Sequence, residues 1–127
     1  MQTNEIPQQQ WVRFFDDFSR QHAGWVVTLE VIGREIGDQN EVNNLPLVGL
    51  SADIKGTEPR IEIIAGRRTT SHVTRIINRP KRVWVKEPGE TIEIESEDET
   101  KTLLSFEQVQ PGESERQLTG QTGKGRG

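Results

Sequence analysis

The chain has 127 residues, of which 31% are hydrophobic and 28% charged, and its formal net charge is -4. This length suits one domain, and the low hydrophobic share implies a thin core or a segment that lies outside it. Cysteine is absent, which excludes disulfides, thiolate nucleophiles and cysteine-based metal sites. Residues 1–10 are polar, and no apolar run approaches the roughly 20 residues that span a bilayer. We therefore expect a cytoplasmic protein without membrane contact.

An aromatic stripe marks the N-terminal part of the chain. Its members recur at i, i+3, i+4 and i+7, the spacing of one helix face: Trp11, Phe14, Phe15 and Phe18. Pro7 suits the first turn of such a helix and Gly24 suits its end, so the pattern predicts a helix from Gln8 to Gln21. We expect the stripe to form the core together with Trp25, which begins the next strand, rather than to dock into a partner's groove.

The chain after Gly24 is typical of short strands separated by turns. Alternation predicts strands at residues 25–32, 45–54, 60–65, 73–77, 82–86, 91–95 and 102–106, and a loop at 33–44. This spacing favours an α+β domain over residues 8–109, in which the N-terminal helix packs on a strongly curved antiparallel sheet or small barrel of six to seven strands. Residues 110–127 are glycine-rich, with Leu118 as their aliphatic residue, and are predicted to form a flexible tail.

The sign of the charge reverses along the predicted strands. Between Arg60 and Lys86 there are eight cations and one carboxylate, Glu62, whereas the stretch from Glu87 to Glu99 has seven carboxylates and no cation. A fold that places these segments on different surfaces has a basic face and an acidic face. Such separation suits the binding of a charged partner better than it suits chemistry.

Several motifs extend from Trp11 to Phe106. The opening reads W-x2-FF-x2-FS-x2-H-x-GW, followed by TLEV, and the later landmarks are PLxG, SHV, ESED and TLLxF. Together these motifs resemble a small bacterial family that is catalogued as a domain of unknown function. The resemblance implies no activity, cofactor or catalytic residue. The family pattern has Asp-Gly in its last hairpin, whereas this chain has Asp98-Glu99, which argues against a tight two-residue turn.

The two histidines, His22 and His72, have two interpretations. Facing Glu30 or Asp53, they would form a metal site or an acid–base pair. Alternatively, His22 caps the C-terminus of the helix and His72 lies at the end of a strand. Because the motif supplies no third nitrogen or sulfur ligand, we favour the structural interpretation and expect no metal, no cofactor and no catalytic residue.

The basic segment contains the candidate binding residues, which are Arg67, Arg68, Arg75, Arg79, Lys81, Arg82 and Trp84. Single-strand nucleic-acid binders stack bases on an aromatic ring flanked by cations, and Trp84 has such neighbours. The pI of about 5.3 and the absence of a known nucleic-acid-binding motif weigh against this function.

We therefore expect a non-catalytic cytoplasmic binding or adaptor domain that recognises a protein partner through separated basic and acidic faces. One alternative is RNA or single-stranded DNA binding through residues 75–86 and Trp84. A second alternative is a small enzyme that uses a histidine with a carboxylate. An adaptor needs an exposed apolar patch or a sheet edge rimmed by charge, whereas an enzyme needs a concave pocket that contains a histidine.

Overall fold

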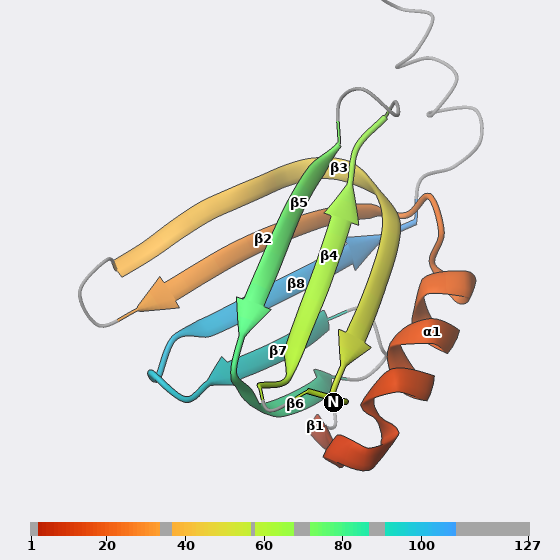
Figure 1. Ribbon diagram of the computed structural model, residues 1–127. Coiled ribbons are helices and arrows are strands. Elements are labelled where there is room, and N and C mark those ends of the chain that lie inside the picture. Colours follow the sequence, from red (N-terminus) through yellow and green to blue (C-terminus); the bar gives the residue numbers. More distant parts are fainter. Residues whose placement is uncertain (1–2, 34–36, 57, 68–71, 87–90, 109–127) are drawn as a thin grey trace, which may run out of the picture.

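The computed structural model describes residues 3–33, 37–56, 58–67, 72–86 and 91–108. These residues form one short α-helix, a preceding 3-10 helix and eight strands (Figure 1). The elements are β1 (Thr3–Ile6), the 3-10 helix (Gln8–Gln10), α1 (Trp11–Gln21), β2 (Val26–Gly33), β3 (Gly37–Asp53), β4 (Arg60–Ala65), β5 (Val73–Asn78), β6 (Pro80–Lys86), β7 (Thr91–Ser96) and β8 (Lys101–Glu107). The two helices together match the predicted span from Gln8 to Gln21.

The strands form one antiparallel sheet in the order β1-β6-β7-β8-β2-β3-β4-β5. The 17-residue strand β3 bends and takes part in both halves of the sheet. Its first part pairs with β2 as far as Pro46, and its second part pairs with β4 from Leu47 to Asp53. Register shifts lie on both sides of this change of partner, and such bulges increase the local bend.

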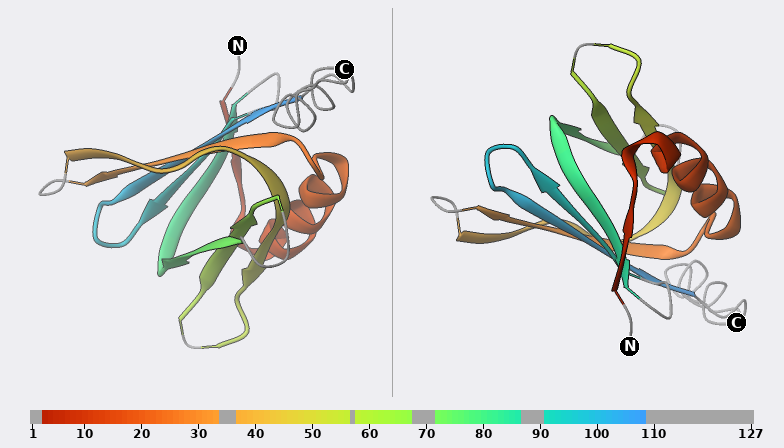
Figure 2. Two further views of the ribbon diagram at one scale, coloured as in Figure 1. Left: turned by 90° about the horizontal axis from the view of Figure 1, so that it is seen from above. Right: turned by 90° about the horizontal axis from the view of Figure 1, so that it is seen from below.

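The sheet is strongly curved but is not closed into a barrel (Figure 2). Its end strands are β1 and β5, and the described residues show no pairing between them. After β5 the chain turns at Arg79, whose φ is 51°, and enters β6, which pairs with β1 and β7. The α+β class and the antiparallel sheet are confirmed, whereas the alternative of a small barrel is wrong, because the end strands β1 and β5 do not pair with each other among the described residues.

The count of six to seven strands is also wrong. The four-residue strand β1 lacks an apolar alternation, and it forms because its backbone pairs with β6, where Ile6 lies opposite Val83. The predicted loop at 33–44 is strand from Gly37 onwards. Its polar sequence does not predict a strand, but the segment pairs with β2 in a hairpin and buries Val42. The predicted tail, residues 110–127, lies outside the described residues.

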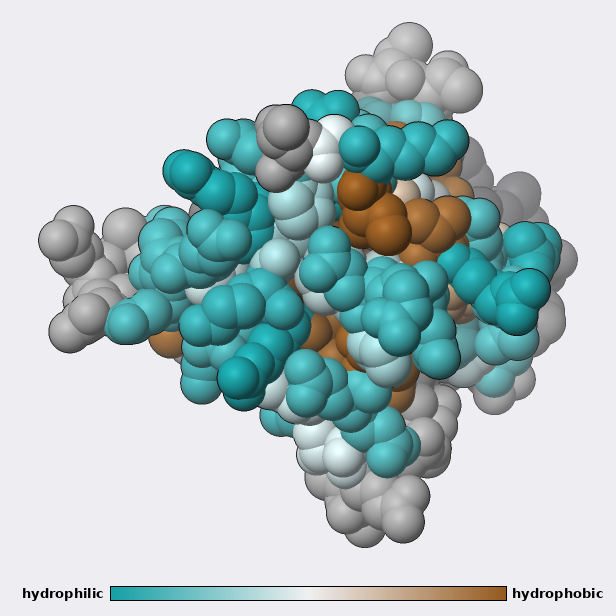
Figure 3. Space-filling view, turned by 60° about the horizontal axis from the view of Figure 1, so that its bottom comes forward, coloured by the Kyte–Doolittle hydropathy of each residue, from teal (hydrophilic) through white to brown (hydrophobic). Residues whose placement is uncertain are grey.

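The core fills the concave side of the sheet. Trp11, Phe15 and Phe18 of α1 are buried in it, and Phe14 and Trp25 pack against it partly exposed. The ring of Phe18 meets that of Phe106 on β8 edge to face, at 4.9 Å. Outside the core, hydrophilic side chains cover most of the face in Figure 3, with small hydrophobic areas between them. In the described part of the chain, no helix is long and apolar enough to cross a membrane.

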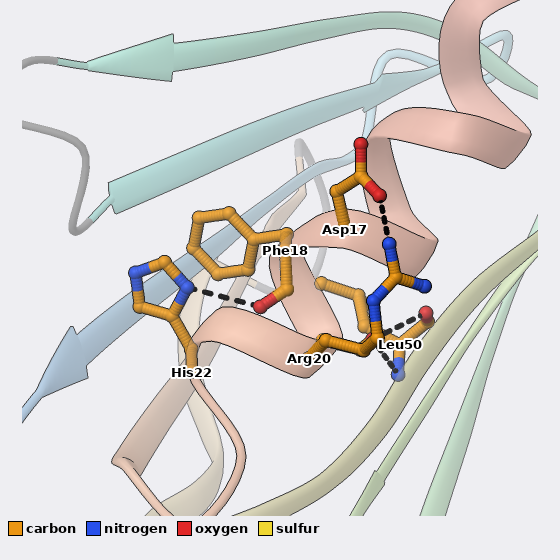
Figure 4. A network of polar contacts seen from close by, with 6 residues as sticks. Asp17, Phe18, Arg20, His22 and Leu50 are labelled. Carbon is orange, nitrogen blue, oxygen red and sulfur yellow. Dashed lines mark hydrogen bonds and ion pairs between the residues drawn. The ribbon is translucent and has the colours of Figure 1, made fainter.

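Helix α1 and the turn after it cover the edge of β3 that β2 leaves. The Gly24 N–H donates to the Leu47 carbonyl at 3.0 Å, and the Leu47 N–H donates to the Trp25 carbonyl at 2.8 Å. Further along, Ser19 Oγ accepts from the Leu50 N–H at 2.8 Å and donates to the Leu50 carbonyl at 2.7 Å (dashed lines at Leu50, Figure 4). One serine thus replaces the strand that would otherwise pair at Leu50.

Candidate functional site

The basic and acidic segments meet on one surface instead of forming separate faces. Strands β6 and β7 are neighbours in a hairpin, and the outward residue Arg82 lies opposite Glu95. Lys86 Nζ lies 3.3 Å from a Glu93 carboxylate oxygen, and Lys101 Nζ lies 3.9 Å from the other. The expectation of two separated charged faces is therefore wrong for these strands. In a hairpin, residues of one parity share a face, so a basic strand followed by an acidic strand forms cross-strand pairs.

Trp84 lies among carboxylates as well as cations. It shares the outward face of β6 with Arg82, as its parity predicts, but its direct neighbours on the adjoining strands are Glu5 and Glu93. A nucleic acid stacked on this half-buried indole would bring its phosphates close to both carboxylates. This arrangement does not favour nucleic-acid binding.

The other candidate cations are dispersed. Arg67 is exposed after β4 and donates to the Asn44 carbonyl at 3.4 Å. Arg75 is half-buried on β5, on the same face of the strand as the buried Ile77. Arg79 occupies the turn between β5 and β6, Lys81 is exposed at a register shift, and Arg68 lies outside the described residues. The structure therefore brings Arg82 and Trp84 together but does not gather the six described candidates into one surface.

His22 caps the C-terminal end of α1, and its partly buried ring contacts the neighbouring aromatic rings (Figure 4). Its Nδ1 lies 3.0 Å from the Phe18 carbonyl, its ring stacks on Phe18 at 3.8 Å, and Trp25 meets it edge to face at 4.4 Å. His72 is exposed immediately before β5. No group of three or more histidine, aspartate or glutamate side chains among the described residues is arranged to hold a metal ion.

The outer face of β3, β4 and β5 contains a shallow depression of about 270 Å³. It is lined by Ser51, Asp53, Arg60, Glu62 and Ile76. Cross-strand pairing places these residues together, because Glu62 lies opposite Ser51 on one side and opposite Ile76 on the other. A second depression, of about 330 Å³, lies at the start of β2 beside Asn44. Among the described residues, no histidine lines either depression.

The charges in the first depression are unequal. Asp53 and Arg60 lie opposite each other and form an ion pair at 3.9 Å, and Asp53 also accepts from the Lys55 N–H at 3.2 Å. Glu62 is half-buried and forms no ion pair within the described part of the chain. One cation and two carboxylates leave a formal charge of -1, located at Glu62.

Strand β5 forms the free edge beside this depression (Figure 1). Within the described residues it pairs with β4 alone. Ile76 is 46% exposed and Val73 is 37% exposed, so β5 carries two of the four large exposed hydrophobic side chains of the described chain. The outer face of β5 carries no charge, because its remaining members are Thr74 and Asn78. This is a sheet edge with apolar side chains, rimmed by charge.

Glu62 and Ile76, the two residues at the centre of this edge, were not among the candidates predicted from the sequence. Two signals were available. Glu62 is the single carboxylate in the basic stretch between Arg60 and Lys86. Ile76 and Ile77 are adjacent, and in a strand one of two adjacent isoleucines faces away from the core. Which of the two faces outward depends on the register of β5 with β4.

Comparison with known proteins agrees with the resemblance seen in the motifs. The model of a family described as "Family of unknown function (DUF5335)" matches residues 2–115. An uncharacterized protein of Aquifex aeolicus (strain VF5) is 37% identical over 114 residues, which cover 87% of this chain and 97% of that protein. No solved structure matches. The chain belongs to this family of unknown function, DUF5335.

Proposed function

We propose that this protein is a non-catalytic cytoplasmic binding domain that recognises a protein partner by accepting an extended segment along β5. The observation that carries the proposal is the free edge of β5, where the exposed Ile76 lies beside the charged depression and the exposed Val73 lies on the opposite face of the strand. Strand addition at such an edge gains affinity from main-chain hydrogen bonds and specificity from alternate side chains. The cysteine-free sequence fits the reducing conditions of the cytoplasm.

The other end of the sheet is less suited to the same role. Strand β1 has four residues, and Pro7 follows it directly. Short edge strands and proline are devices that discourage the addition of another strand. Strand β5 has six residues, no proline, and Arg75 as its one charged side chain, on the face opposite Ile76. The two ends therefore differ in how well they would accept a partner.

A peptide selection on the full chain tests this proposal. The probe is a phage-displayed library of random twelve-residue peptides, and bound peptides are mapped by amide hydrogen exchange. We expect enriched peptides to slow exchange in β5. Ile76→Ser should weaken their binding, whereas Val48→Ser should not, because Val48 is equally exposed, at 46%, but lies outside the depression. Failure to enrich any peptide, or protection confined to another element, would contradict the proposal.

The nucleic-acid alternative has a separate test. A labelled single-stranded oligonucleotide at low salt should show no binding that Trp84→Ala abolishes, because Glu5 and Glu93 flank the indole. Salt-sensitive binding lost in Trp84→Ala would instead assign the function to the β6 face.

A further inference from the structure

The depression beside β5 carries one uncompensated charge next to an exposed apolar side chain. The Asp53 carboxylate is engaged by Arg60 and by the Lys55 amide, whereas Glu62 lacks a cation among the described residues. The register places Ile76 directly between Glu62 and the free edge. The side chain of a strand added beyond β5 therefore has to extend past Ile76 before it can contact Glu62.

The spacing of strands decides which side chains can use this arrangement. Adjacent strands lie about 4.8 Å apart, so a residue of an added strand opposite Ile76 lies about 10 Å from the backbone of Glu62. A short polar side chain on that strand does not span the width of Ile76. Lysine and arginine do, because their long aliphatic stems cover apolar surface while the charged end reaches further.

We infer that the segment bound at β5 carries a lysine or arginine opposite Ile76, with its stem on Ile76 and its cation at Glu62. This inference rests on the proposed function, because it needs a strand added at β5. The half-buried position of Glu62 strengthens the pairing, since solvent screens it less than it screens a fully exposed carboxylate. An acidic residue at the same place would meet Glu62 and be repelled.

A second copy of this chain does not supply the required cation. If β5 paired with β5 of another molecule, the outer face would gain Thr74, Ile76 and Asn78 of that copy. Arg75, the one charged residue of β5, belongs to the opposite face. The charge of the depression thus favours a different protein with a basic extended segment over self-association.

The experiment uses the full chain and the peptides selected from the random library. We expect the enriched peptides to share one lysine or arginine within an alternating pattern of β-branched residues. Replacing that residue with norleucine, which keeps the apolar stem, should weaken binding about tenfold. Glu62→Gln should weaken binding of the basic peptide by the same factor and should not change binding of the norleucine peptide.

Glu30→Gln is the matched control. Glu30 is also half-buried and lies on β2, outside the depression, so this variant should bind the basic peptide like the wild type. Peptides that slow exchange in β5 but lack a shared cation, or that bind Glu62→Gln and wild type equally, would overturn the inference while leaving strand addition intact. Failure of every peptide to protect β5 would instead reject the proposed function on which the inference rests.

Discussion

Two edges in the same part of the sheet differ in whether other residues cover them. The edge of β3 beyond Pro46 is covered by α1 and the following turn, and Ser19 satisfies both backbone groups of Leu50. The edge of β5, two strands away, has no corresponding cover among the described residues. Helix α1 therefore covers the edge of β3 and leaves the edge of β5 available for pairing with another strand.

The difference separates stability from recognition. The covered edge lies against the aromatic core, so changes there affect backbone hydrogen bonds and packing together. The side chains of the open edge that face outward contact little of the core, and their substitution costs little stability. A surface of this kind can change its specificity without loss of the fold. Four predictions test this division, from the largest expected effect to the smallest.

The covered side should be most sensitive at the buried end of the aromatic stripe. Phe18→Ala removes a ring that is 5% exposed and is expected to cost about 3–5 kcal/mol of unfolding free energy. Phe14 packs against the core but stays partly exposed, so Phe14→Ala should cost about 1–2 kcal/mol. Urea denaturation measures both values. Losses below about 1 kcal/mol for both variants would mean that the stripe is not part of the core.

The hydroxyl that covers β3 should have a measurable effect of its own. Ser19→Ala leaves the Leu50 N–H and carbonyl without their 2.8 Å and 2.7 Å partners, at an expected cost of about 1–3 kcal/mol. Ser105→Ala is the control, because Ser105 is exposed on β8 and should tolerate the change. Chemical denaturation compares them, and hydrogen exchange at Leu50 should accelerate in Ser19→Ala. Equal stability of the two variants would show that water replaces the serine without cost.

The sequence was sufficient for elements whose apolar pattern directly determines burial. The helix stripe and the alternation of Ile92 and Ile94 predict their positions in the core, and both isoleucines are fully buried. It was insufficient where backbone pairing alone forms a strand, as in β1 and in the polar start of β3. The sequence also did not predict whether the sheet closes into a barrel, because closure depends on which strands pair after the turn at Arg79.

Even less of the candidate site than of the fold could be predicted from the sequence. The basic segment was evident, but its neutralisation at Glu93 and Glu95 follows from the β6–β7 hairpin. The depression at Glu62 and Ile76 depends on the register of three strands and on β5 being the last of them. Charge counts along a sequence do not contain this information, since they say nothing about which charges face one another.

A smaller effect is expected at the turn that supports the corner between β5 and β6. The Glu97 N–H donates to the Arg79 carbonyl at 3.0 Å, and Ser96 and Thr100 close a three-residue loop with Glu99 at a φ of 72°. This is not a two-residue turn, as we predicted because the chain has Asp98-Glu99 where the family pattern has Asp-Gly. The turn is held internally by the Asp98 carboxylate, which accepts from the Thr100 N–H at 3.0 Å.

This contact makes the turn sensitive to acid. Hydrogen bonds from Thr100, with a smaller contribution from Arg79, lower the pKa of Asp98 below its usual 3.8. The ionised Asp98 carboxylate therefore stabilises the folded state fully above its unfolded-state pKa. This stabilisation is lost as the pH falls through the lower folded-state pKa. Asp98→Asn should be less stable than wild type near neutral pH, and the difference should shrink below about pH 4. Thermal melts across pH 2–7 measure it, and a difference independent of pH would contradict this role.

The open edge gives the smallest expected effect and the sharpest comparison, because β5 contains two adjacent isoleucines on opposite faces. Ile76→Thr alters a side chain that is 46% exposed, so its unfolding free energy should stay within about 0.5 kcal/mol of wild type. Ile77→Thr, one residue further along the same strand, shortens a side chain that is 8% exposed and buries a hydroxyl, at a cost of about 2–3 kcal/mol. Urea denaturation of the two variants compares the same substitution in the same strand. Equal losses would mean that Ile76 is covered in the native protein, and the edge of β5 would then be unavailable for a partner strand.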